Sequence, residues 1–144
     1  MIDNIQKDTL INTINLLLEK YNIKLVELNV MTYRNENKFK FVLFNESGLS
    51  LDMMEKVHLK IDKFIEKKGY DNYSIELSSP GINRIFKSEA EYNIFKNKRL
   101  KLILKENKIV EGINKGLKEN KVTINNNNND MLINVDNIIK AKLA

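Results

Sequence analysis

The chain has 144 residues, of which 42% are hydrophobic and 30% are charged, and it contains no cysteine. This balance is typical of a folded globular protein, and the lack of cysteine excludes disulfides and thiolate metal sites. No apolar run is long enough to span a membrane, and the N-terminus has no basic segment followed by an apolar one. We therefore expect a cytoplasmic protein.

The net charge of +5 is distributed unevenly along the chain. Residues 1–78 hold 11 Lys and Arg against 12 Asp and Glu (net −1), whereas residues 79–144 hold 13 against 7 (net +6). This excess favours a polyanion as the partner of the second half. The chain is also rich in Lys, Asn and Ile, so a general bias in residue usage is an alternative source of the surplus.

The first half shows helical spacing of apolar residues twice and strand alternation three times. Asp3 or Asn4 can cap the first helix and Ser50 the second, which Gly69 follows. The order α-β-β-α-β predicts an α+β domain whose helices cover one face of a small sheet. The expected elements are a helix over 3–21, strands over 25–32 and 39–44, a helix over 50–68 and a strand over 73–77.

The second half reads as a short helix followed by short strands. The helix is expected over 88–95, with a Ser cap, and the strands over 100–104, 109–116, 121–124, 131–135 and 138–143. Five short strands at close spacing predict a small closed or nearly closed barrel. Gly112 and Gly116 mark points where a long strand can bend. The asparagine run over 125–130 is expected to form a long hairpin loop.

These elements predict two domains. An N-terminal α/β domain covers 1–82, a linker with the short helix covers 83–96 and a β-barrel domain covers 97–144. The only proline, Pro80, is followed by Gly81, and this pair fits the centre of a type II turn. We interpret a four-residue turn as the joint between the domains: Ser78, Ser79, Pro80 and Gly81.

Residue types used in catalysis are present but form no recognisable site. His58 is the only histidine and has no second ligand or nucleophile in register, so we interpret it as structural or surface-exposed. Four carboxylates are explained as helix-cap or solvated residues: Glu46, Asp52, Glu55 and Asp62. No phosphate-binding loop or dinucleotide motif occurs. We expect no enzyme activity, cofactor, metal or small-molecule substrate.

The strongest candidate site is a cluster of seven cations in which Glu89 and Glu91 are the only acids: Arg84, Lys87, Lys96, Lys98, Arg99, Lys101 and Lys105. Such a strip can neutralise the phosphates of a nucleic acid without reading its sequence. Tyr92 and Phe95 lie nearby and would suit base stacking, but their spacing on the short helix favours burial.

The stretch YSIELSSPGINR (73–84) resembles the signature of the RimP family of bacterial ribosome maturation factors. Three further segments resemble the family in the same order: SGLSLDMMEKV (47–57), SEAEYNIFKNKRLKLIL (88–104) and DNIIKAKL (136–143). The family usually has aspartate where this chain has Asn83 and proline where it has Ile85. We therefore expect a less rigid linker and no charge at position 83.

The resemblance implies an N-terminal α/β domain followed by an SH3-like barrel. It also implies binding to the small ribosomal subunit or its precursor during assembly, without catalysis, through rRNA, a ribosomal protein or both. The seven cations would then be rRNA or ribosome contacts. A general RNA- or protein-binding small-barrel adaptor, not dedicated to ribosome assembly, is the alternative. No coiled coil or large apolar seam is evident, so we expect a monomer.

Overall fold

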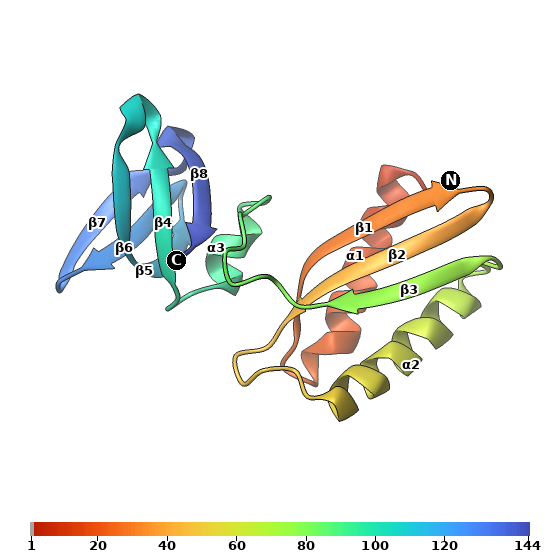
Figure 1. The fold of residues 1–144 in the computed structure, drawn as a ribbon. Coiled ribbons are helices and arrows are strands. Elements are labelled where there is room, and N and C mark those ends of the chain that lie inside the picture. The colour runs from red at the N-terminus through yellow and green to blue at the C-terminus, as the bar shows by residue number, and fades with distance from the viewer. Residues whose placement is uncertain (1) are drawn as a thin grey trace. The chain divides into compact units, whose positions relative to one another are not determined.

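The computed structural model describes residues 2–144, and the chain divides into two compact units between Pro80 and Gly81 (Figure 1). Each unit has its own hydrophobic core. The first contains two helices and a three-stranded sheet, and the second is built on five antiparallel strands. The α+β class predicted from the sequence is confirmed.

The first unit follows the predicted order of elements: α1 (Asn4–Glu19), β1 (Lys24–Tyr33), β2 (Glu36–Phe44), α2 (Leu51–Lys67) and β3 (Tyr73–Ser78). In the sheet, β1 and β2 are antiparallel, and β3 lies parallel to β2. A parallel neighbour needs a long crossover, which α2 supplies. No helix described here is long and apolar enough to cross a membrane.

Both long helices begin at the caps that the sequence predicts. The Asp3 carboxylate accepts a hydrogen bond from the Gln6 amide, and the Gln6 side chain accepts one from the Asp3 amide. Ser50 accepts from the Met53 amide at the start of α2. These bonds satisfy amides that have no partner within the helix.

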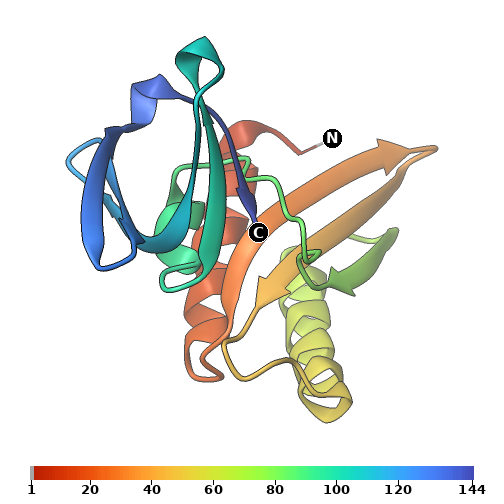
Figure 2. The same cartoon turned by 60° about the vertical axis from the view of Figure 1, so that its left-hand side comes forward.

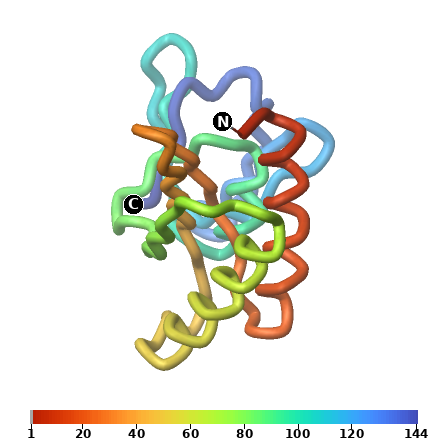
Figure 3. Tube along the Cα trace, turned by 90° about the vertical axis from the view of Figure 1, so that its right-hand side faces the viewer, coloured from red at the N-terminus to blue at the C-terminus, as the bar shows by residue number. Residues whose placement is uncertain are grey.

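The core of the first unit lies between the two helices and one face of the sheet. Phe39, Phe41 and Leu43 alternate along β2 and are fully buried there. A bulge between Leu25 and Glu27 in β1 lets Leu25 and Leu28 both join this core, although their spacing is odd. Figure 3 shows α1 and α2 side by side, and Ile14 and Ile61 are among the residues that they bury.

The second unit begins with a short helix and continues with strands: α3 (Ala90–Ile94), β4 (Arg99–Leu104), β5 (Ile109–Lys118), β6 (Lys121–Asn126), β7 (Asn129–Asn134) and β8 (Ile138–Leu143). In the strand order β7-β6-β5-β4-β8, the last strand of the chain, β8, lies beside β4, the first strand of this unit (Figure 2). Leu100, Leu102 and Leu104 alternate into the core of this sheet.

Three hairpins are closed by turns of only two residues. They are Arg34-Asn35, Glu119-Asn120 and Asn127-Asn128, all with positive φ at both positions, as a type I′ turn requires. The long loop expected over 125–130 is therefore wrong. Asparagine tolerates the left-handed conformation, and β6 and β7 continue into the run up to Asn126 and from Asn129.

A buried asparagine attaches α3 to the sheet. Asn114 on β5 is fully buried, and its amide group donates to the carbonyls of Tyr92 and Phe95 at 2.8 and 2.9 Å. Its side-chain oxygen accepts from the Gly116 amide. The register of β5 shifts between Asn114 and Leu117, and Gly116 lies there at φ 105°, so the predicted bend is present at this glycine.

The backbone at Pro80-Gly81 differs from the expected type II turn. That turn needs a positive φ at Gly81, and Gly81 is not among the residues with positive φ. The turn lies further along, where the Arg84 amide donates to the Gly81 carbonyl, with Ile82 and Asn83 at its centre. The expected type II turn centred on Pro80-Gly81 is therefore wrong, because Gly81 has no positive φ and is the first residue of the hydrogen-bonded turn.

Two glycines should therefore respond oppositely to alanine. A Cβ at Gly112 would lie 2.6 Å from both the Asn125 carbonyl oxygen and Ile124 Cγ2, whereas one at Gly81 would meet nothing within 4 Å. We expect Gly112→Ala to lower the free energy of unfolding by about 1–3 kcal/mol. Gly81→Ala should leave it equal or raise it by up to about 1 kcal/mol, because it restricts the unfolded chain. Urea denaturation measures both, and equal losses would contradict this difference.

A second prediction concerns Tyr73, whose hydroxyl donates to the Asp62 carboxylate. This hydrogen bond raises the pKa of Tyr73 to about 12, and burial raises the pKa of Tyr92 to about 12. Because the folded state holds the phenol protonated, the stability it adds is present below pH 10 and is lost as the pH rises towards 12. In a phenolate absorbance titration, Tyr73 and Tyr92 should together produce the step near pH 12, so Tyr73→Phe should halve it. An unchanged step would contradict the assignment.

Candidate nucleic-acid interface

The first part of the predicted cation cluster lies on the outer face of β4. Along this strand the leucines point into the core, so the side chains of Arg99 and Lys101 point to the opposite face. Arg99 contacts Glu111 on β5 at 3.4 Å, and both side chains are about half exposed (52% and 42%). An exposed pair of this kind contributes little to stability. Lys101 is partly exposed and lies directly opposite Glu111 in the register of β4 and β5.

Strand β8 adds two lysines that the sequence analysis did not include. Lys101 lies directly opposite Lys142, and Ile103 lies opposite Lys140. Both lysines are therefore on the outer face, since the adjoining Leu102–Ala141 pair is buried. We name the set Arg99, Lys101, Lys140 and Lys142 the β4–β8 basic face. Lys140 and Lys142 could not be assigned to it from the sequence, because only the long-range register joins residues about forty positions apart.

The other predicted lysines lie outside this face. Lys96 follows α3, and its methylene chain covers Gly116, where an added Cβ would lie 2.5 Å from Cε. Lys98 directly precedes β4, and its carbonyl accepts from the Asn114 amide. Lys105 is exposed in the 3-10 turn that follows β4. These three cations thus occupy the two ends of the strand.

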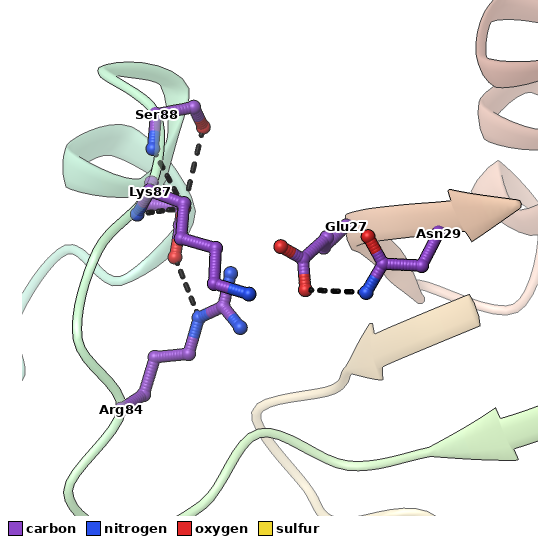
Figure 4. Close-up of polar contacts among 6 residues, drawn as sticks. Glu27, Asn29, Arg84, Lys87 and Ser88 are labelled. Atoms are coloured by element: carbon purple, nitrogen blue, oxygen red, sulfur yellow. Dashed lines mark hydrogen bonds and ion pairs between the residues drawn. The ribbon is translucent and has the colours of Figure 1, made fainter. Parts of the chain in front are cut away.

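Arg84 belongs to a buried ion pair. Its Nε donates to the Glu91 carboxylate at 2.8 Å, and the side chains of Arg84 and Glu91 are only 9% and 1% exposed. Figure 4 shows Arg84 with Lys87 and Ser88, whose backbone amides donate to the same carboxylate at 2.8 and 2.9 Å. Glu91 is therefore no surface acid, and Arg84 is oriented by the protein itself.

This arrangement also replaces the expected Ser cap of the short helix. The helix begins after Glu89, which makes no side-chain capping bond, and the Ser88 hydroxyl donates to Glu91 instead. The carboxylate reaches back to the amides before the helix, as the acid of a capping box does. Charge on Arg84 then compensates for the burial of Glu91.

Residues 84–86 extend the sheet beside β8. Phe86 donates its amide to the Ala141 carbonyl, and Leu143 donates to the Arg84 carbonyl. Ile85 faces Lys142 between these two bonds, so its own amide points away from β8. A proline, which the RimP-like pattern has here, would lose no hydrogen bond to this strand.

The remaining candidates are explained by the fold. Tyr92 and Phe95 are buried, as their spacing predicts, and Phe86 packs against both rings. His58 is exposed on α2, which agrees with a surface histidine. Among residues 2–144, no three acidic or histidine side chains are grouped as metal ligands would be.

The Glu91 cluster predicts an order of destabilisation. We expect Glu91→Ala to lower the free energy of unfolding by about 3–5 kcal/mol, because it leaves two amides and a buried guanidinium without their acceptor. Arg84→Gln should cost less, since Glu91 keeps its backbone donors. The exposed neighbour serves as control, and Glu89→Gln should change stability by less than about 0.5 kcal/mol. If thermal and urea unfolding gave equal losses for all three variants, the central role of Glu91 would be refuted.

Comparison with known proteins bears on the same segments. The family model of the RimP N-terminal domain matches residues 13–83. The chain is 30% identical over 134 residues to the ribosome maturation factor RimP of Borrelia garinii subsp. bavariensis, covering 92% of each chain. It is 33% identical over 142 residues to the protein of the same name from Borrelia recurrentis, covering 99% of this chain and 96% of the relative.

A third relative, the ribosome maturation factor RimP of Borrelia hermsii, is 28% identical over 144 residues and spans both chains completely. Similarity therefore extends through both compact units and is not confined to the segment that the family model matches. Together with the signature at 73–84, this coverage establishes the relationship: the chain belongs to the RimP family of ribosome maturation factors.

Proposed function

We propose that this protein binds the small ribosomal subunit or its precursor in the cytoplasm and assists its maturation without catalysing a reaction. Membership of a ribosome maturation family supports the process. The observation that carries the binding mode is the β4–β8 basic face, where two adjacent strands present four cations. Ribosomal RNA is a polyanion, and lysines that replace its counterions favour association.

The contact that we propose positions the protein on rRNA phosphates without reading bases. Lys101, Lys140 and Lys142 supply point charges suited to phosphate, whereas Arg99 is shared with Glu111. Lys87, Lys96, Lys98 and Lys105 would extend the contact beyond the face. Arg84 is assigned a structural role, since its guanidinium already binds Glu91.

We also propose how the two units serve this function. The first acts as an α/β domain and the second as an SH3-like barrel domain, for which the five antiparallel strands and their order are the support. Ser78, Ser79, Pro80 and Gly81 then form the joint, because the chain passes from one unit to the other within them. The protein acts as a monomer that leaves once mature ribosomal contacts compete for its site.

Neutralising two lysines of the face tests the proposal. Lys101 and Lys142 lie opposite each other, so Lys101→Gln/Lys142→Gln removes two charges from one place. We expect weaker co-sedimentation with free small subunits, and the slope of log Kobs against log salt should decrease in magnitude by about 1.4 to 1.8.

The matched control is Lys118→Gln/Lys121→Gln at the β5–β6 hairpin, which changes the net charge equally. Its slope should stay near that of the unchanged protein. If the two double variants had equal effects, binding would depend on the net charge of the protein and not on the β4–β8 basic face. If the unchanged protein failed to enrich with small subunits or their precursors, the proposed function itself would be wrong, and a general RNA- or protein-binding adaptor would replace it.

A further inference from the structure

The near-neutral first unit has a strongly polarised helix. On α2, Lys56, Lys60, Lys63 and Lys67 follow one another at intervals of four, three and four residues, which places them in one narrow arc along about 16 Å of the helix. All four are exposed. Three acids of the helix fall in a different arc, Glu55, Asp62 and Glu66, whereas Asp52 lies four residues before Lys56 at the start of the stripe. A total charge near zero therefore conceals a positive stripe.

The stripe borders a groove between α1 and α2 of about 380 Å³. Its apolar floor consists of Leu16 and Leu17 from α1 and Phe64 from α2, and Leu16 is 70% exposed. Lysines form its rim on both sides: Lys20 at the end of α1, and Lys60, Lys63 and Lys67 from α2. We name this feature the α1–α2 lysine groove. The two helices that form it lie side by side in Figure 3.

The rim lysines are not neutralised by the protein. Within residues 2–144, no ion pair involves any of the four, nor Lys56. Lys63 and Lys67, like Lys56 and Lys60, are like charges four residues apart, an arrangement that destabilises an isolated helix by about 0.2–0.5 kcal/mol per pair. An anion bound along the stripe would relieve this repulsion.

We propose that the α1–α2 lysine groove binds the phosphate backbone of unpaired ribosomal RNA, with a base or ribose against its apolar floor. The inference rests on the proposed function and adds to the first unit an RNA contact of its own. Single cations repeated along a helix suit a strand that repeats single negative charges. Lysine recognises phosphate as a point charge, and a basic groove that also offers an aromatic side chain, here Phe64, is a common way to hold single-stranded RNA.

An acidic amphipathic helix fits the groove less well. A helix that docks in a groove needs a row of apolar anchors spaced along its length. The floor offers only three apolar side chains, and they are grouped in one place. The seven residues that line the groove include no arginine to grip a carboxylate through two parallel bonds.

The test uses the full chain and a short labelled oligouridylate RNA, with fluorescence anisotropy at several salt concentrations. Lys60→Gln/Lys63→Gln removes two rim charges from the middle of α2, and glutamine preserves the helix propensity. We expect weaker RNA binding and a salt slope smaller in magnitude by about 1.4, the value for two phosphate contacts to a single strand. The control, Lys7→Gln/Lys38→Gln, removes two charges of the same unit that do not line the groove.

The double variant must differ from its control for the inference to stand. Equal RNA binding by the two variants would overturn it. RNA binding at the level of the control combined with weaker sedimentation with small subunits would also overturn it, and would assign the groove to an acidic protein segment. If the unchanged protein did not sediment with small subunits but the rim variant still lost RNA affinity relative to its control, the proposed function would fail while the groove remained an RNA site.

Discussion

The second unit depends on one buried carboxylate. Glu91 accepts hydrogen bonds from the Arg84 guanidinium, from two backbone amides and from a hydroxyl, and so it fixes the chain over residues 84–88. That fixed segment lies along β8, where Ile85 faces Lys142. Glu91 is buried and lies outside the β4–β8 basic face, but the segment that it fixes lies beside Lys142 of that face. Residues 84–88 therefore contribute both to the stability of the second unit and to the proposed binding surface.

The sequence predicted the helices and strands well because their burial is periodic. Leu10, Ile14 and Leu18 repeat at helical spacing, and the leucines of β4 alternate. It could not predict that Glu91 is buried, since an acid early in a helix ordinarily faces solvent. It also missed Lys142, because the neighbour of Lys101 is set by strand register. Local composition therefore located half of the basic face and assigned Arg84 to the wrong environment.

Net charge per half of the chain was an incomplete guide to electrostatics. It drew attention to the second unit, where the cations are in excess. It drew attention away from the first, where opposite charges cancel in the sum although most acids of α2 lie on a different side from its lysines. A ligand as long as an RNA strand experiences the local field of a few neighbouring side chains, because salt screens charges beyond about 10 Å. Arrangement along a helix is therefore more informative than the total.

The two-residue hairpins also bear on how this sequence can diverge. Among residues 2–144, seven of the ten non-glycine residues with positive φ are asparagine, and all ten lie between 50° and 69°. Gly116 lies at 105°, outside the left-handed region open to asparagine. A lineage that accumulates asparagine can thus exchange it freely with glycine at the hairpin turns, whereas Gly116 must persist. Residue usage at these turns can therefore change without a change of backbone conformation.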